Sequence, residues 1–208
     1  LFTFGRASTA TYTDSTGAIQ SAADNVARLN HHVYENGQWV NKGIFIETEQ
    51  RTNLFLFSQF LSTQNVTVSA TPHTVHFTGS GEIVFSGAYT GSLSGAGSGE
   101  ENRVTLTFTP SAGTLTCTVS GTVSFAQIEA GATPSSYIPT TNAEVSRAKE
   151  TCFASEAAWS ANAFSIHTQG LVTYSDGGNF AEAMVCRIRN NDFSQRAELR
   201  IDTNSTNT

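Results

Sequence analysis

Residues 103–109, RVTLTFT, and residues 114–120, TLTCTVS, decide the fold class of this chain. In both stretches an apolar residue recurs at every second position between polar ones. Because successive side chains of a β-strand point to opposite faces of the sheet, this alternation puts the apolar side chains on one face. We therefore predict two neighbouring strands, each buried on one face only.

The same alternation predicts further strands at residues 65–69, 74–78, 82–85 and 123–125. They recur about every ten residues with Gly, Pro or Ser at the breaks, which is typical of an antiparallel β-sandwich. The Gly/Ser-rich break at residues 91–99 is poor in apolar residues and lacks the Lys of a phosphate-binding loop, so we predict a flexible loop tip there. The predicted fold class is all-β.

The chain divides into three regions that differ in how regularly apolar and polar residues alternate. Residues 1–60 are irregular, with a hairpin turn at Glu35-Asn36-Gly37 between 33–34 and 39–40. Residues 61–141 form the predicted sandwich. Residues 142–208 begin with a linker at 142–150 and a helical turn at most at 155–159. Strands are then expected at 164–167, 171–174, 183–188 and 197–201, with a turn at 176–179. These are too few to close a second sandwich, so we expect its front part, within a longer polypeptide.

Composition excludes several protein classes. Only 13% of the residues are charged and the net charge is −6, which argues against disorder and against a nucleic-acid partner needing a basic patch. No apolar run reaches the roughly 20 residues that span a bilayer, so we expect no membrane insertion, and the first residues do not resemble a signal peptide. The three cysteines, Cys117, Cys152 and Cys186, are far apart, so we expect buried free thiols.

Neither a catalytic nor a metal site stands out. The histidines lack metal-ligand spacing, and there is no nucleophile-elbow motif. Calcium is the alternative to having no cofactor, with Asp14, Asp24 and Asn25 as donors, although no loop is dense in such residues. Glu47 and Glu49 share a strand face, as the paired carboxylates of a glycosidase would. We expect them instead to bind Arg51 or to cap backbone donors, and we predict no enzyme.

Aromatic side chains are the remaining candidates for ligand contact. Trp39 lies beside the predicted hairpin turn and Tyr89 beside the Gly-rich stretch. Both are expected to be exposed, where they can stack on the apolar face of a sugar ring. The alternative is that these rings, like most aromatics, fill cores or cover sheet edges.

FGRASTATY at 4–12, followed by Asp14 and Gly17, is the first of several blocks that resemble a widespread family of bacteriophage and prophage virion proteins. It is similar to the family's F-x-R-A-S-T-A-T-Y-x-D-x-x-G opening. AADNVARL at 22–29 resembles A-A-x-N-x-P-R-F, with Ala27 in place of the usual Pro. The other matching blocks are GIFIETEQRTNL at 43–54, FSQF at 57–60, and AQIEAG at 126–131 with TPSSYIPT at 133–140 and Arg147. They lie in the family's order and span residues 4–147, about two-thirds of the chain.

The resemblance implies a carbohydrate-binding-module-like jelly roll followed by a concanavalin A-like (laminin-G-like) sandwich. It further implies a structural protein of a tail fibre or tail tip, located in the virion after synthesis in the bacterial host cytoplasm. Its expected partners are other tail proteins, copies of itself in a homotrimer, and a host-surface glycan. The alternatives are a fragment of a capsule or lipopolysaccharide depolymerase and a pure adaptor between tail proteins.

The family has no firm set of catalytic residues to transfer, so none is assigned. We predict that the charged and polar residues of the matching blocks form a framework that joins the N-terminal region to the sandwich. Its members are Arg6, Glu47, Arg51, Asn53, Glu129 and Arg147.

Overall fold

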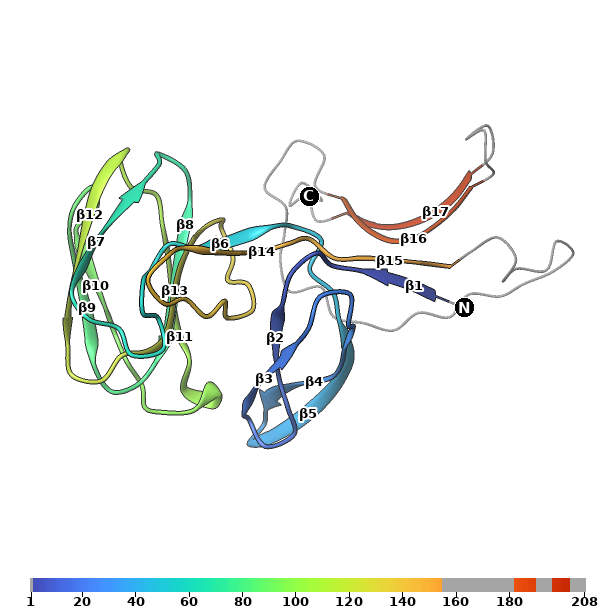
Figure 1. Ribbon diagram of the computed structural model, residues 1–208, viewed down its shortest axis with the longest axis horizontal. Coiled ribbons are helices and arrows are strands. Elements are labelled where there is room, and N and C mark those ends of the chain that lie inside the picture. The colour runs from blue at the N-terminus through green and yellow to red at the C-terminus, as the bar shows by residue number, and fades with distance from the viewer. Residues whose placement is uncertain (1, 155–181, 190–195, 203–208) are drawn as a thin grey trace, which may run out of the picture. The chain divides into compact units, whose positions relative to one another are not determined.

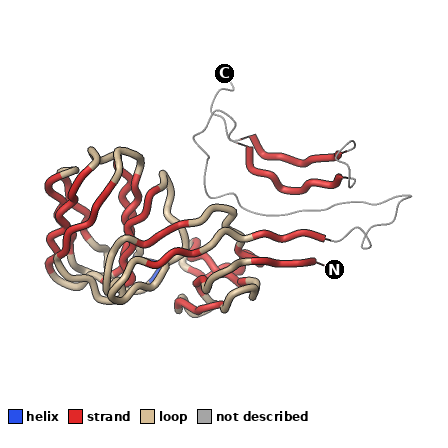
Figure 2. The backbone as a smooth tube through the Cα atoms, turned by 45° about the horizontal axis from the view of Figure 1, so that its top comes forward, coloured by secondary structure: helices blue, strands red, loops and turns tan. Residues whose placement is uncertain are grey.

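The computed structural model describes residues 2–154, 182–189 and 196–202. Strands dominate these residues (Figure 2), with one 3₁₀ turn, η1 (Glu100–Asn102). The predicted all-β class is confirmed. Among the described residues no helix has both the length and the apolar character needed to cross a membrane. The chain divides into two compact units, Leu1–Trp159 and Ser160–Thr208.

Two antiparallel sheets of the first unit form a β-sandwich (Figure 1). One sheet has the order β10 (Gly91–Ser94), β9 (Glu82–Gly87), β12 (Gly113–Ser120), β7 (Gln64–Val68). The other has the order β11 (Val104–Phe108), β8 (His73–Thr78), β13 (Ser124–Ala130). The predicted strand positions are confirmed, and their alternate apolar residues pack into one core that includes Val75, Phe77, Ile83, Phe85, Leu115 and Ile128.

One edge of this sandwich differs from the prediction. Residues 91–94 form β10, paired in register with β9 from Gly91↔Phe85 to Ser94↔Glu82. Leu93 packs against the core between two exposed serines. This part of the predicted loop is therefore an edge strand, with Leu93 as its apolar side chain toward the core.

The N-terminal region contributes short strands outside the sandwich. These are β1 (Phe2–Gly5), β2 (Ala10–Thr13), β3 (Ile19–Ala22), β4 (Arg28–Glu35), β5 (Gln38–Phe45) and β6 (Arg51–Asn53). β2 pairs with β3, and β4 with β5. Asn36 and Gly37 turn the second hairpin with positive φ angles of 51° and 80°, the conformation that an Asn-Gly turn favours. The predicted hairpin is confirmed.

The chain that leaves the sandwich returns to the N-terminal region. Residues 142–150, predicted as a linker, contain β14 (Val145–Arg147), which pairs with β6. β15 (Thr151–Ala154) then pairs with β1 (Figure 1). In this pair Phe2 lies opposite Ala154. The predicted domain boundary between 141 and 142 thus falls inside the first unit.

In the second unit, β16 (Glu182–Arg189) and β17 (Arg196–Asp202) form an antiparallel pair, at the positions of two predicted strands. The other predictions for this region, at 155–159, 164–167, 171–174 and 176–179, lie outside the described residues.

Strand β8 is buried on both faces, whereas the alternation predicted burial on one. Val75 and Phe77 face the core, yet the intervening Thr74 and His76 are buried as well. Their face of the sheet is covered by residues 131–141, which we call the covering segment. Its Gly131 carbonyl accepts a hydrogen bond from Thr74 Oγ1 (2.8 Å) and its Ile138 N–H donates to Gln127 Oε1 (2.6 Å).

Candidate functional site

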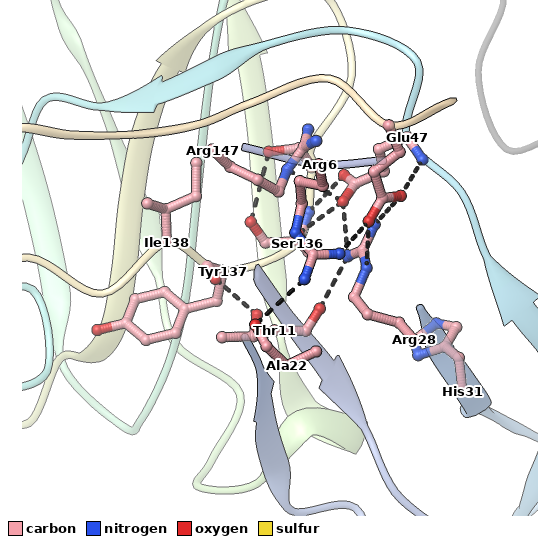
Figure 3. A network of polar contacts seen from close by, with 12 residues as sticks. Arg6, Thr11, Ala22, Arg28, His31, Glu47, Ser136, Tyr137, Ile138 and Arg147 are labelled. Carbon is pink, nitrogen blue, oxygen red and sulfur yellow. Dashed lines mark hydrogen bonds and ion pairs between the residues drawn. The ribbon is translucent and has the colours of Figure 1, made fainter. Parts of the chain in front are cut away.

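A cluster of buried charged side chains lies where the N-terminal strands meet the covering segment. We call it the buried charge network and define it as Arg6, Arg28, Glu47, Arg147 and Glu150. Figure 3 shows Arg6, Arg28, Glu47 and Arg147 meeting in one place.

Glu150, three residues beyond β14, is the centre of the network and its side chain is fully buried. Arg28 binds it in a bidentate fork, with Nε 3.0 Å from Oε1 and Nη2 2.6 Å from Oε2. Arg6 Nη1 donates to Oε1 at 2.5 Å and the Glu47 backbone N–H donates to Oε2 at 2.7 Å. Such charge-assisted, bidentate contacts are the strongest hydrogen bonds available to a carboxylate.

Glu47 links the network to the covering segment. Its Oε2 lies 2.8 Å from Arg28 Nη1 and 3.1 Å from Arg147 Nε. The Ser136 backbone N–H and hydroxyl donate to the two Glu47 oxygens at 2.9 Å and 2.6 Å. Glu47 therefore caps backbone donors, one of the two roles that the sequence predicts for it.

Arg6 holds the backbone around β3 and β4. Its Nη2 donates to the carbonyls of Ala22, Ala23 and Val26, and its Nε to the carbonyl of Ser8. One side chain thus fixes the course of the chain between two hairpins, which explains why it needs a fork of several donors rather than a Lys.

The network carries an excess of positive charge. Three guanidinium groups face two carboxylates, a net charge of +1 (3 − 2). Burial lowers the pKa of Arg147, and the negative charge of Glu47 opposes this shift. Arg147 Nε lies within ion-pair distance of Glu47 without the alignment of a hydrogen bond, so this contact is electrostatic attraction alone.

Glu129 and Arg51 form a second, shallower cluster. Glu129 is fully buried and accepts hydrogen bonds from the Ser135 N–H and hydroxyl at 2.7 Å and 2.6 Å. Arg51 is partly exposed; it lies 2.6 Å from Glu49 and 3.6 Å from Glu129. The expected Glu49–Arg51 pair therefore forms, at the surface.

His76 joins this cluster to the sandwich. Arg103 Nη1 donates to His76 Nδ1 at 2.6 Å, so the ring is neutral, with its proton on Nε2, 3.6 Å from Glu129 Oε1. Burial lowers the pKa of His76. Burial alone would raise the pKa of Glu129, but the contacts with His76 and Ser135 hold it below its ordinary value.

Asn53 is the neutral member of the predicted framework and is fully buried. Its amide donates to the carbonyls of Ala126 (3.0 Å) and Ile138 (2.8 Å). Its oxygen accepts from the N–H groups of Phe55 (3.1 Å) and Ile128 (3.2 Å). One amide thus joins β13 to the covering segment.

The two aromatic candidates are half-buried rather than exposed. The Trp39 ring covers Gly17 so closely that a Cβ there would lie 2.4 Å from the ring, and it also contacts Tyr34, with 5.1 Å between ring centroids. Tyr89 stacks on Phe108 with 4.2 Å between centroids. Both rings have internal packing partners, and the structure does not bring them together with the charged clusters.

The carboxylates of the network are placed to hold structural elements together rather than to catalyse a reaction. Each oxygen of Glu47 and Glu150 already accepts from a protein donor. Among the described residues no group of His, Cys, Asp or Glu is arranged to hold a metal ion. Of the calcium donors considered, Asp14 accepts from Thr16, Ala18 and Gln20, and its pKa is lowered to about 2, chiefly by the Thr16 hydrogen bond.

Two central members of the network were not singled out from the sequence. Arg28 lies within the matching block at 22–29 but is not among the residues predicted to form the framework. Glu150 lies in the predicted linker, without any local pattern. Both become recognisable only once Glu150 approaches Arg28 across 122 residues of chain.

No family model, curated protein or solved structure matches this chain.

Proposed function

We propose that this chain is a structural protein of a bacteriophage particle, in a tail fibre or tail tip, without a catalytic role in this region. One observation carries the proposal: three charged residues of the blocks that resemble virion proteins are held by internal contacts. Arg6 and Arg147 are buried, and Glu47 is held by donors on both of its oxygens. A residue that holds structural elements together can lie inside, whereas a catalytic residue must reach a substrate.

The strand pairing of the first unit supports the same proposal. Because Phe2 lies opposite Ala154, the two ends of the described segment 2–154 lie side by side, and the sandwich lies away from the β1–β15 pair (Figure 1). A projecting module of this kind suits a fibre that displays surfaces to a host or to neighbouring proteins.

The proposed partners are other tail proteins, further copies of the chain in a homotrimer, and a host-surface glycan. The glycan contact is assigned to Trp39 and Tyr89. Their half-buried, internally packed rings favour the second candidate function, an adaptor that binds neighbouring tail proteins and no sugar.

Incubation of the full chain with the capsule and lipopolysaccharide of the host tests the proposal. We expect retention on the polysaccharide, no released oligosaccharide, and weaker retention of the Trp39→Ala and Tyr89→Ala variants. A Val84→Ser variant, altered at an exposed sheet position, is the matched control. Oligosaccharide release would overturn the structural role in favour of a depolymerase. Absence of binding to these polysaccharides and to a glycan array would favour the adaptor.

A further inference from the structure

The tip of the β4–β5 hairpin is the place where the sequence has its only Asn-Gly pair, Asn36-Gly37. Both residues are exposed, and a Cβ built on Gly37 would have no atom within 4 Å. Exposed loop tips of this kind tolerate covalent change better than any other part of a fold. Water therefore reaches both the Asn36 side chain and the peptide group that follows it.

Asn36 also differs from the other described asparagines in its hydrogen bonding. Neither its side-chain amide nor the Gly37 N–H has a hydrogen-bond partner among the residues that the structure describes. The side chains of six of the other seven are held by hydrogen bonds: Asn25, Asn30, Asn41, Asn53, Asn102 and Asn142. The seventh, Asn65, lies within β7 and precedes the buried, β-branched Val66. An amide without a partner can turn toward the next peptide nitrogen.

The groups at this tip are the reactants of a ring closure. The Gly37 backbone nitrogen gives up its proton and bonds to Asn36 Cγ, and the side-chain nitrogen leaves as ammonia. Glycine favours this step, because it has no Cβ to shield the attacking nitrogen or to restrict its rotation.

Water then opens the resulting cyclic imide in one of two ways. Cleavage of the new bond between Gly37 N and Asn36 Cγ leaves aspartate at position 36. Cleavage of the bond between Gly37 N and the Asn36 carbonyl carbon leaves isoaspartate, whose main chain runs through Cβ and Cγ. Nothing is oxidised or reduced, and water is the only co-reactant.

We propose that Asn36 is a site of spontaneous deamidation in the folded protein, and that the isoaspartate product opens the tip of the β4–β5 hairpin. Isoaspartate adds a carbon atom to the main chain of a two-residue turn, and the turn sets the register of the strands behind it. Tyr34 and Trp39 face each other directly behind this turn, and the Trp39 ring covers Gly17. The lengthened turn displaces Trp39 from Gly17. The inference is independent of any role in a phage particle.

Ageing of the full chain in mildly alkaline buffer, followed by mass spectrometry of its peptides, tests the reaction. A second sample, unfolded in urea, gives the rate without the turn. In the folded chain we expect position 36 to deamidate at least about tenfold faster than Asn41 or Asn65. Gly37→Ala places a Cβ beside the attacking nitrogen and should slow the reaction. Asn36→Gln, whose longer side chain must close a larger ring, should stay intact.

An Asn36 that stays intact in the folded chain while it reacts in urea would overturn the proposal, because the turn would then protect it. Equal rates at all described asparagines of the folded chain would overturn it as well.

The opening of the hairpin has its own test, in a Trp159→Phe background that leaves Trp39 as the only tryptophan. Ion exchange separates the aged chains by their added negative charge. The isoaspartate fraction is expected to show the fluorescence of a more exposed Trp39. Asn36→Asp adds the same charge without lengthening the main chain, so its emission should match that of the unmodified chain. An isoaspartate fraction with the emission of Asn36→Asp would overturn the opening of the hairpin.

Discussion

Replacing Glu150 with Gln perturbs the buried charge network at its centre. The substitution preserves shape but removes the negative charge that Arg6 and Arg28 share. Three buried guanidinium groups then face Glu47 alone, so the net buried charge rises from +1 to +2 (3 − 1).

The expected loss of stability follows from the burial of these groups. Removing one partner from a buried ion pair costs about 3 to 5 kcal/mol, because the remaining charge stays desolvated without compensation. For a unit of this size, each kcal/mol lowers the midpoint of thermal unfolding by about 2 to 4 °C. Glu150→Gln is therefore expected to lower it by about 6 to 20 °C.

Urea unfolding followed by far-ultraviolet circular dichroism measures the loss in free energy of unfolding, and a thermal scan measures the shift of the midpoint. Glu49→Gln is the matched control. Glu49 makes one ion pair, with Arg51, and 47% of its side chain is exposed. Exposed pairs contribute about 0 to 1 kcal/mol, so the control should stay close to the wild type. A Glu150→Gln chain within 1 kcal/mol of this control would refute the reasoning that the network holds the unit together.

Three further predictions concern other buried groups. Asn53→Ala is expected to destabilise the chain by at least about 3 kcal/mol in the same urea assay, because it leaves buried N–H and C=O groups without partners. Burial lowers the pKa of His31 from 6.5 to about 4. Between these pH values the unfolded chain therefore binds more protons than the folded chain, and the free energy of unfolding falls as the pH drops from about 6.5 to about 4. This fall in the free energy of unfolding should be about 1–2 kcal/mol smaller in His31→Gln, allowing for the partial exposure of the ring. An equal fall in both chains would contradict the assignment of this pH dependence to His31. Burial raises the pKa of the Cys117 thiol to about 12, so a thiol reagent at pH 8 should modify exposed Cys152 and leave Cys117 intact in the native chain, as mass spectrometry of peptides will show.

The sandwich strands were predictable because their signal is local. The alternation TLTCTVS alone predicts that Leu115 and Cys117 face the core, and both are buried. The Asn36-Gly37 turn is equally local, since the turn conformation selects those two residues. The exposed thiol of Cys152, expected to be buried, shows the limit of this reasoning at an isolated residue.

The second buried face of β8 was not predictable, because its cover comes from elsewhere in the chain. Thr74 and His76 look like solvated positions of an alternating strand, and only the return of the covering segment buries them. The charge network has the same origin. Arg6, Arg28 and Glu150 are far apart in sequence, and their pairing depends on β15 returning to β1.

The location of the chain in an assembled particle is the most direct test of the proposed structural role. Phage particles from the strain that encodes the chain can be purified, labelled with gold-conjugated antibody against residues 2–154, and imaged by electron microscopy. We expect the gold at the tail tip or along the tail fibres, and the intact chain among the proteins of the purified particle. Particles that lack the chain, with all of it recovered free from the lysate, would contradict the account.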